Sequence, residues 1–313
     1  MRFAWMIEPQ QGLSYAEQLA VAQHVEAGGF EALFRSDHYQ SFPGPAGNPT
    51  TDAWAVLAGL ARETSRIHLG ALVSPVTFRL PGNMAKVAIT VDEMSGGRVE
   101  LGLGTGWNEA EHRQYGFPFP PIEDRAEMLE EQLQIVRGLF HGDDGWSFAG
   151  RHYTVEGALF RPRPAAGHPR ILVGGRGTPR STRIAARFAD EFNVTTTDPD
   201  RIREVYGWLD DACRAAGRDP RSVTRSAMVG VLIGRDEAEV ERRAGELLRQ
   251  IGRDGDRPWF DGRRSGWIAG TPDQARQAVA RYEAVGVERL MLQSMIPRDL
   301  DMIDLAAEVL IGK

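Results

Sequence analysis

The sequence contains little cysteine, little lysine and no long run of apolar residues. Cys213 is the single cysteine in 313 residues, which excludes an internal disulfide framework and a metal cluster built from cysteines. No stretch reaches the ~20 consecutive apolar residues that a membrane-spanning helix needs, and the first ten residues do not look like a signal peptide. We therefore expect a cytoplasmic protein that has no membrane partner.

Lysine occurs only at Lys86 and Lys313, so nearly all of the 37 basic side chains are arginines. These arginines are scattered among 43 acidic residues, and the formal net charge is -6. A chain with this balance offers no basic patch to a polyanion, which argues against nucleic acid as a partner. A small molecule is the expected substrate.

Motifs of several common enzyme classes are also missing. The sequence has no P-loop, no Gly-x-Gly-x-x-Gly after its first predicted strand and no Ser or Cys nucleophile elbow, which excludes phosphoryl transfer on a P-loop. Histidines away from position 38 fall at no spacing typical of a metal cluster, so no metal site is predicted. These histidines are His24, His68, His112, His141, His152 and His168.

The sequence does contain a repeated alternation of short apolar segments and longer segments with helical spacing. Eight strands alternating with helices, without a long linker, predict one (β/α)8 TIM barrel over residues 1–313. The predicted strands are residues 3–7, 31–35, 67–73, 99–104, 170–174, 191–194, 226–233 and 289–293. The predicted helices are residues 15–27, 51–64, 81–94, 125–140, 179–188, 200–216, 237–251, 272–285 and 300–310.

Two segments break this alternation. Residues 143–165 carry aromatic residues among glycines and prolines, which predicts a short β-hairpin. Residues 253–266 show no periodicity, and we interpret them as an irregular lid insertion in which Trp259 and Phe260 close over the barrel mouth. The alternative is a surface loop that is held by one aromatic anchor or used in dimerisation.

In a barrel of this type the active site lies at the C-terminal ends of the strands. His38 follows the second predicted strand, directly after Asp37, and a histidine there could donate to a ring nitrogen or a carbonyl of a ligand. The alternative is a helix cap followed by a surface histidine. The other residues at strand ends are Glu8, Leu72, Val73, Ser74, Gly104 to Asn108, Gly174 to Arg176, Thr195, Thr196 and Gln293.

A glycine turn, Gly104-Thr105-Gly106, ends the fourth predicted strand. It would let a ligand approach the backbone closely, and the loop that follows begins with Trp107, Asn108 and Glu109, which are unusual residues for a mere connector. The alternative is that the turn is structural and Trp107 plugs the barrel mouth.

A second glycine turn, Gly174-Gly175-Arg176, ends the fifth predicted strand and opens a helix that has proline near its first position. Backbone N–H groups at such a turn can bind phosphate, and Arg176 could add a charge-assisted contact. We therefore expect Gly174→Val to block a phosphate while the fold is retained. The alternative is that the glycines only permit a tight turn. The phosphate site, the first turn and His38 together outline a phosphorylated, extended cofactor of the flavin type.

Four segments carry a resemblance to a known family. They are SDHY from Ser36, GALVSPVTFRLPG from Gly70, MSGGRVELGLGTGWNEAEHRQYG from Met94 and ILVGGRGTPRSTRIAARFADEFN from Ile171. In this order they resemble the bacterial luciferase-like monooxygenase superfamily, and most of all its actinobacterial branch of probable F420-dependent oxidoreductases. The resemblance implies a homodimeric barrel that binds the deazaflavin coenzyme F420, or alternatively FMN, at the strand ends.

The resemblance also implies roles for individual residues. The histidine that matches His38 faces the deazaflavin ring, and a non-proline cis peptide forms a bulge behind it. The candidate cofactor-binding residues are Asp37, His38, Ala71, Leu72, Val73, Gly106, Trp107, Asn108, Gly174, Gly175, Arg176 and Thr195. The candidate catalytic residues, one of which would stand in for the family's missing proton donor unless water does so, are His38, Glu8 and Glu109.

Two positions depart from the sugar-phosphate dehydrogenases of this family, which carry a carboxylate where this chain has Trp107 and a lysine where it has Asp198. A substrate like glucose 6-phosphate is therefore not expected. The implied reaction is hydride transfer between C5 of F420 and a small, fairly apolar unsaturated substrate such as an enone, an imine or a nitroaromatic. The aromatic residues expected to line the mouth are Phe42, Phe78, Trp107, Phe117 and Phe119.

Three other functions stay open at this point. An FMN-dependent monooxygenase that uses O2 is the main alternative, because both cofactors use the same cradle. A non-catalytic flavin-binding barrel and an unrelated barrel lyase or isomerase acting on a sugar phosphate are the others. Titration with F420 and with FMN distinguishes these classes.

Overall fold

The computed structural model describes residues 1–165 and 169–312 and has a closed barrel of parallel strands at its centre. β9 pairs with β10 and β12 pairs with β1, so the ring of strands closes. Within the described residues this confirms the predicted (β/α)8 barrel; His168 lies outside them. The barrel strands are β1 (Arg2–Ile7), β2 (Ala32–Arg35), β3 (His68–Ala71), β5 (Val99–Gly104), β8 (Arg170–Gly175), β9 (Glu191–Val194), β10 (Thr224–Ile233) and β12 (Arg289–Ser294).

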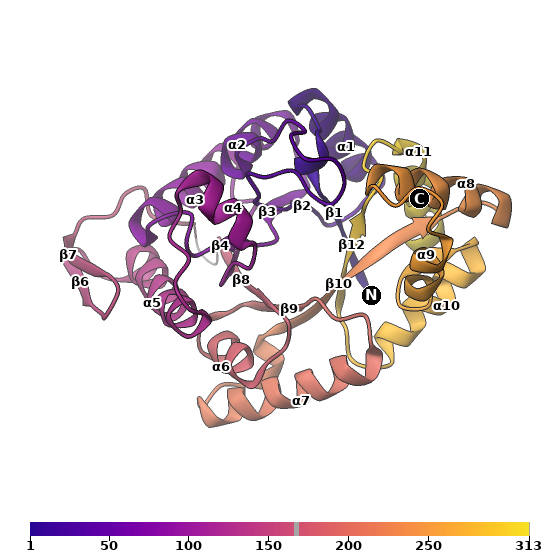
Figure 1. Cartoon of the computed structure of the whole chain (residues 1–313). Helices are drawn as coiled ribbons and strands as arrows, with labels where there is room; N and C mark the ends of the chain where they lie inside the picture. The colour runs from indigo at the N-terminus through magenta and orange to yellow at the C-terminus, as the bar shows by residue number, and fades with distance from the viewer. Residues whose placement is uncertain (166–168, 313) are drawn as a thin grey trace.

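Helices surround the strands as a ring (Figure 1). Local signals set many of their ends: Ser14 and Glu17 form a capping box at the first helix, and proline stands in the first turn of α3, α6, α7 and α10, where its missing N–H costs nothing. The helices of the ring are α1 (Tyr15–Ala27), α2 (Ala53–Glu63), α3 (Pro81–Ser95), α5 (Ile122–His141), α6 (Pro179–Phe188), α7 (Pro199–Ala215), α8 (Glu237–Gln250), α10 (Pro272–Glu283) and α11 (Leu300–Leu310).

The strands separate two apolar cores. Side chains alternate between the two faces of a strand, so Phe3, Trp5 and Ile7 of β1 pack in the outer core under the helices, whereas Ala4 and Met6 point into the barrel. The inner core is small and reaches the mouth through two partly exposed side chains, Val73 and Met228. Its buried members are Ala4, Met6, Ala32, Phe34, Leu72, Leu172 and Met291.

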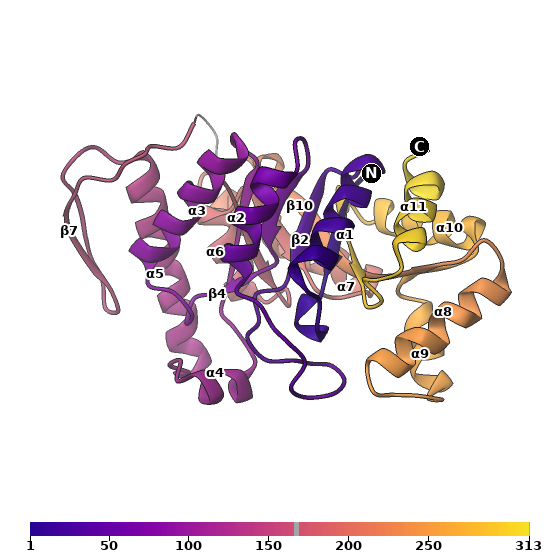
Figure 2. The same cartoon turned by 90° about the horizontal axis from the view of Figure 1, so that it is seen from above.

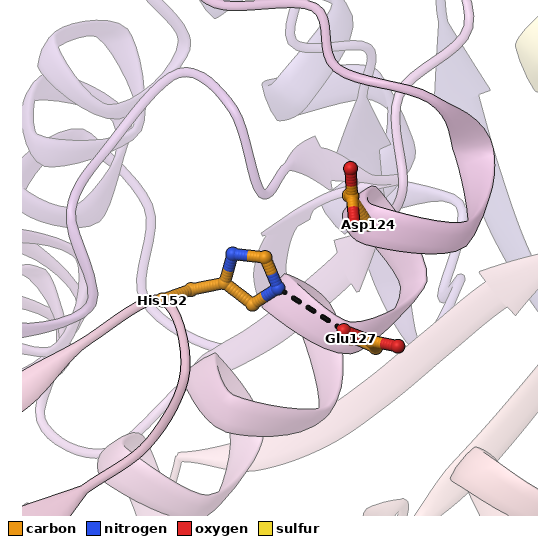
Figure 3. Close-up of side chains that lie close together, drawn as sticks. All are labelled: Asp124, Glu127 and His152. Carbon is orange, nitrogen blue, oxygen red and sulfur yellow. Dashed lines mark hydrogen bonds and ion pairs between the residues drawn. The ribbon is translucent and has the colours of Figure 1, made fainter.

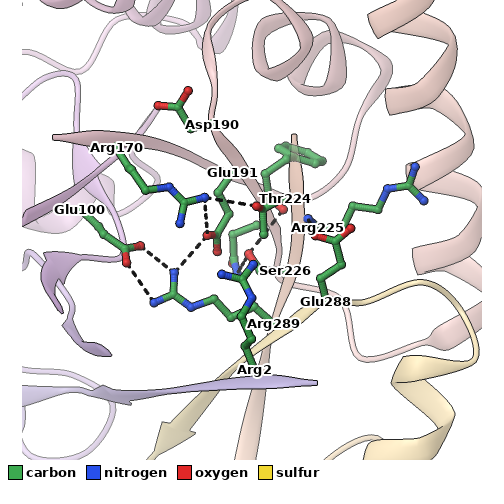
Figure 4. Close-up of polar contacts among 12 residues, drawn as sticks. Arg2, Glu100, Arg170, Asp190, Glu191, Thr224, Arg225, Ser226, Glu288 and Arg289 are labelled. Carbon is green, nitrogen blue, oxygen red and sulfur yellow. Dashed lines mark hydrogen bonds and ion pairs between the residues drawn. The ribbon is translucent and has the colours of Figure 1, made fainter. Parts of the chain in front are cut away.

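A buried layer of charges fills the barrel at the N-terminal ends of its strands (Figure 4). Arg289 donates to Glu100 at 2.6 Å and to Glu191 at 3.0 Å, and all three side chains are buried. Burial opposes ionisation of Glu100, but the Arg289 charge prevails and holds its pKa below the usual range. Burial, together with the neighbouring Glu100, raises the pKa of Glu191. This end of the barrel is therefore held by shared charge and is closed to ligands.

The structure corrects the sequence prediction in several segments. The loop expected after β5 contains a helix, α4 (Glu109–Tyr115), and the expected irregular insertion contains another, α9 (Arg257–Arg264). Two short strands, β4 (Ser74–Pro75) and β11 (Ile268–Gly270), and two 3-10 helices, η1 (Pro9–Gln11) and η2 (Pro220–Ser222), also lay outside the prediction. The predicted hairpin is confirmed as β6 (Trp146–Ala149) and β7 (Thr154–Ala158).

The helix α9 was missed because only one of its apolar side chains is buried. Phe260 is fully buried and meets the Trp267 ring edge to face, and Asp256 caps the helix by accepting from the N–H of Trp259. Ion pairs of Arg257 with Glu241 and of Arg264 with Glu237 hold α9 on α8. The lid function stays a prediction. Because Phe260 is buried, Trp259, which is half-buried, is the aromatic residue of α9 that could close over the mouth.

A side view places α4, α9 and the loop between β2 and α2 at one end of the barrel and the chain termini at the other (Figure 2). The first end is the C-terminal end of the parallel strands. In the described part of the chain, no helix is both long and apolar enough to cross a membrane.

Candidate functional site

The C-terminal ends of the strands gather the residues that the sequence proposed. Because the strands are parallel, Glu8 after β1, His38 after β2, Val73 after β3 and Thr195 after β9 all lie at the same end of the barrel. Gly104 and Gly175 end β5 and β8 at this level. The mouth of the barrel is therefore the candidate site.

The expected non-proline cis peptide bond is confirmed and joins Leu72 to Val73. Glycines accommodate the Val73 side chain: a Cβ on Gly104 would lie 2.6 Å from Val73 Cγ2, and one on Gly174 would lie 2.8 Å from Val73 Cγ1. Real Cβ atoms do not come so close to other carbons, so any side chain at these two positions would displace Val73.

This packing corrects one expectation. Gly174→Val is expected to displace Val73, because the new Cβ would lie 2.8 Å from Val73 Cγ1, so a loss of cofactor binding in this variant would not isolate the phosphate site. Gly175 differs from Gly174, because its Cβ would lie 3.5 Å from Ser181 Cβ and 3.7 Å from Ser181 Oγ, which are ordinary contacts. Gly175 is therefore the residue at which the phosphate interpretation can be examined.

His38 is held by a buried carboxylate. Its Nδ1 lies 2.9 Å from Glu111 Oε2, and the two side chains are 13% and 1% exposed. The other oxygen of Glu111 accepts hydrogen bonds from the backbone N–H groups of Tyr39 and Gln40. The histidine and the chain that follows it are thus tied to α4.

Two aromatic rings flank the imidazole of His38. The Phe42 ring centroid lies 4.5 Å from it and that of Trp107 lies 5.9 Å from it, both edge to face. Trp107 is 60% exposed, so it does not plug the mouth as a buried residue would. Phe42 and Trp107 give the site an apolar wall beside His38.

The other aromatic residues expected at the mouth belong to a second cluster. Phe78 is buried and packs against Phe117 with ring centroids 4.6 Å apart, and Phe119 packs on His112 at 4.5 Å and is covered by Arg125. All three rings pack against His112 of α4. They leave Phe42 and Trp107 as the aromatic surface offered to a substrate.

Asp37 does not face the mouth. It is buried, accepts from Ser74 Oγ at 2.7 Å and forms an ion pair with Arg79. Arg79 also pairs with Asp52, at the start of α2. These contacts give Asp37 a positioning role, in which it fixes the loop that carries His38 against β4 and α2.

The three acids near the mouth differ in surroundings. Glu8 is buried and accepts from Gln10 Nε2 at 2.8 Å and from Gln293 Nε2, so it lies in a polar network at the ends of β1 and β12. Glu109 is exposed on the first turn of α4. The carboxylate that contacts His38 belongs to Glu111, two residues later.

The second glycine turn precedes α6 as predicted. Thr178 and Ser181 form a capping box. The N–H of Thr178 donates to Ser181 Oγ at 2.8 Å, and the N–H of Ser181 donates to Thr178 Oγ1 at 3.2 Å. These two N–H groups are therefore already used, and an anion would meet other N–H groups of the turn. Arg176 is exposed at the turn, where it could add its charge.

Three further positions of the site complete the assignments. Thr195 is exposed, and its N–H donates to Gly175 O at 3.3 Å. Gly106 takes a positive φ of 75°, which favours glycine. Asn108 begins α4, with its side chain making no capping bond. Each of these residues lies at the mouth as expected, and their cofactor contacts stay predictions.

Sequence reasoning did not assign Glu111 and His112 to the site. His112 Nδ1 donates to Asn108 O at 2.7 Å, and its Nε2 accepts from Thr77 Oγ1 at 2.6 Å. Burial lowers the pKa of His112, which fits a neutral ring with both nitrogens bonded. The signal that could have found them is the adjacent Glu-His pair in the polar stretch that follows the first glycine turn.

A further group of possible metal ligands lies away from the mouth. Asp124 and Glu127 of α5 and His152 of the hairpin face one another (Figure 3), although the spacing of the histidines had suggested no such group. Arg151 already pairs with Glu127 at 2.6 Å and with Asp124 at 3.4 Å. The trio is therefore explained by ion pairing that fixes the hairpin on α5.

Comparisons with known proteins agree with this architecture. The sequence profile of the family described as luciferase-like monooxygenase matches residues 1–289. The F420-dependent glucose-6-phosphate dehydrogenase of Microbacterium testaceum is 34% identical over 70% of this chain, and the match spans only 64% of that relative's length. The pyrimidine monooxygenase RutA of Stutzerimonas stutzeri is 27% identical over 97% of this chain and 85% of its own.

A solved structure has the same fold. The F420-dependent secondary alcohol dehydrogenase in complex with an F420-acetone adduct superposes with a TM-score of 0.86 over 99% of this chain and 98% of that chain. Its sequence identity is 18%, so the likeness concerns the fold alone.

Proposed function

Since the chain belongs to the luciferase-like monooxygenase family, we propose that it is an oxidoreductase that uses the deazaflavin F420. The observation that carries the proposal is His38, which a buried carboxylate orients at the barrel mouth. The relative at 34% identity, which bears an F420-dependent name, supports the choice of cofactor. Because less than two thirds of that relative is matched, the activity of the whole protein is a proposal.

The residues at the mouth suit a flat, apolar ring with a charged tail. Val73 and Met228 form a partly exposed apolar floor, and Gly104 keeps the backbone beside Val73 free of a side chain. When bound, the deazaflavin supplies or accepts the hydride at C5. The turn at Gly175 and Arg176, next to the N-terminus of α6, would hold a phosphate of the tail.

The chain's own residues would orient the reactants and handle a proton. His38 Nε2, on the ring edge away from Glu111, would bond a polar atom of the substrate or cofactor. Phe42 and Trp107 would exclude water from that contact. Glu8, bonded to Gln10 and Gln293, is a second candidate for holding a proton, and Glu109 is too exposed to be preferred over it.

We propose a small, fairly apolar unsaturated substrate, of the enone, imine or nitroaromatic type. The exposed Trp107 ring beside His38 favours apolar contacts. Asp198 is used as the cap of α7, where it accepts from the N–H of Asp200 at 3.0 Å, and it adds negative charge where a sugar phosphate would need a cation. We also propose that the protein is a homodimer.

The second candidate is an FMN-dependent monooxygenase that uses O2. The observation that favours it is the likeness to the pyrimidine monooxygenase, which extends over 97% of the chain. Both proposals place a flavin-type ring at the same mouth, so the cofactor separates them.

The test is anaerobic turnover of reduced F420 with an enone, an imine and a nitroaromatic, followed by the return of deazaflavin absorbance. We expect turnover without O2, and a loss of at least about 100-fold in kcat for His38→Ala, because such groups act mainly in the transition state. His24→Ala, on the outside of α1, is the matched control. Turnover that requires O2, or a His38→Ala enzyme as fast as the wild type, would contradict the proposal.

A further inference from the structure

We propose that Glu111 is a positioning residue that fixes His38 in one tautomer, with the proton on Nδ1 and the lone pair of Nε2 turned to the barrel mouth. The tautomer follows from the geometry alone. Its consequence for hydride transfer rests on the proposed function, and the experiment keeps the two apart.

The hydrogen bonds around Glu111 leave little freedom in its assignment. Oε1 accepts from two backbone N–H groups, those of Tyr39 and Gln40, the second at 3.0 Å. Oε2 lies 2.9 Å from His38 Nδ1. A carboxylate only accepts hydrogen bonds, so Nδ1 must be the protonated nitrogen of a neutral His38.

The opposite edge of the ring carries the consequence. Nδ1 is the ring nitrogen that contacts Glu111, so Nε2 is the nitrogen left for a ligand, on a ring that packs edge to face with Phe42 and Trp107. With Nδ1 as donor to Glu111, a neutral His38 presents a hydrogen-bond acceptor to a ligand, and a protonated His38 presents a donor. Glu111 therefore sets which hydrogen bond the mouth can offer.

The helix that carries Glu111 is itself fixed. His112, the next residue, bonds to Thr77 at 2.6 Å and to Asn108 at 2.7 Å. Consecutive side chains on α4 thus fasten it both to the loop after β2 and to the segment after β4. Glu111 is also 1% exposed, so water does not replace it as the partner of His38.

The variant Glu111→Gln gives a sharp test because it is isosteric. Its amide oxygen must keep the two backbone N–H donors of Tyr39 and Gln40, since the reverse orientation would leave two donors facing an NH2 group. The NH2 group then faces His38 Nδ1 as a donor. We expect the His38 tautomer to invert, with the proton moving to Nε2.

The measurement is 15N NMR of the histidine side chains without cofactor, at about pH 8.5, where an ordinary imidazole is neutral. His38→Gln assigns the signal. In the wild type and in Glu111→Asp, which keeps the carboxylate, we expect Nδ1–H. In Glu111→Gln we expect Nε2–H for His38, while His112, fixed by Asn108 and Thr77, keeps its Nδ1–H signal as the internal control.

Two results would overturn the assignment: an Nε2–H tautomer of His38 in the wild type, or Nδ1–H retained in a folded Glu111→Gln. If Glu111→Gln fails to fold, the wild-type and Glu111→Asp spectra decide. The functional arm is separate. We expect Glu111→Gln to lower kcat at least about 100-fold, with unchanged F420 affinity and with recovery in Glu111→Asp; an inverted tautomer with unchanged kcat would keep the assignment and reject His38 from the proposed reaction.

Discussion

Among single residues, the adjacent glycines Gly174 and Gly175 have different surroundings and therefore different roles in the site. A Cβ at Gly174 would overlap the Val73 side chain, whereas a Cβ at Gly175 would make an ordinary contact with Ser181 at the start of α6. The sequence shows two equivalent glycines before a helix. Only the packing of Val73, which follows β3, distinguishes the residue that shapes the floor from the one that can face a phosphate.

The two glycines give a matched pair of variants. Gly175→Ala is expected to keep the melting temperature and to weaken F420 binding, because its methyl group would occupy the space where the phosphate approaches the backbone. An overpacking penalty of about 1–3 kcal/mol corresponds to about a 5- to 150-fold rise in Kd. Gly174→Ala is expected to lower the melting temperature, because its Cβ lies 2.8 Å from Val73 Cγ1.

Thermal melting and fluorescence titration with F420 measure both effects. An unchanged Kd for Gly175→Ala would show that the turn is structural. An unchanged melting temperature for Gly174→Ala would show that Val73 adapts without cost.

At the scale of elements, α4 determines how the mouth is built. It is a short helix of seven residues, too short to be stable without tertiary contacts. Its stability comes from polar side chains: Glu111 bonds to the loop after β2, and His112 bonds to Thr77. The contacts that fold α4 are the same contacts that orient His38.

The buried His112 predicts a pH dependence. Burial lowers its pKa in the folded state, so the unfolded chain binds a proton at a higher pH than the folded chain does. The stability from this site is therefore fully present above about pH 6.5, the ordinary histidine value, and is lost as pH falls below it, by at most about 1.4 kcal/mol for each pH unit. The measurement is urea unfolding between pH 8 and pH 5.

His112→Gln serves as the control because it removes the titrating ring and keeps a side chain that forms hydrogen bonds. We expect the wild type to lose more stability than this variant on acidification. His141 also has a lowered pKa. Its contribution to the pH dependence is the same in both proteins and cancels in the comparison. Parallel pH profiles would reject the assigned role of His112.

How much of this could be predicted from sequence depended on which signals were local. The helices α1, α6 and α11 have the predicted ends, because capping residues and apolar spacing mark them. The helix α4 was missed because it buries Glu111 and His112 rather than apolar residues, so it has no hydrophobic period. The partners of His38 and Gly174 are Glu111 of α4 and Val73 after β3, which are distant in sequence, and no local pattern specifies such contacts.

At the scale of the whole molecule, the barrel has two unlike ends. The mouth carries the candidate site, and the N-terminal end is closed by Arg289 with Glu100 and Glu191 (Figure 4). A buried arginine shared by two carboxylates holds three strands, β5, β9 and β12, in one layer. Such a layer is sensitive to the loss of one partner, because the remaining charges stay buried.

Arg289→Met is expected to destabilise the fold by about 3–5 kcal/mol at pH 7. The exposed Arg214, which pairs with Asp211 at 2.9 Å, is the control, and Arg214→Met should cost no more than about 1 kcal/mol. Glu100 has a lowered pKa in the fold, so its contribution is present above its unfolded value of about 4.3 and is lost as pH falls. The deficit of Arg289→Met should therefore shrink in acid; urea unfolding that gives equal losses for both variants would contradict this account.

We propose that this barrel mouth binds a deazaflavin. Binding of F420 and of FMN to the purified protein tests this directly. Fluorescence titration with F420 and with FMN under the same conditions gives both dissociation constants. We expect F420 to bind far more tightly than FMN, and Gly175→Ala to weaken the F420 complex. Equal or tighter binding of FMN would contradict the claim and favour the monooxygenase, and binding of neither would reject both proposals.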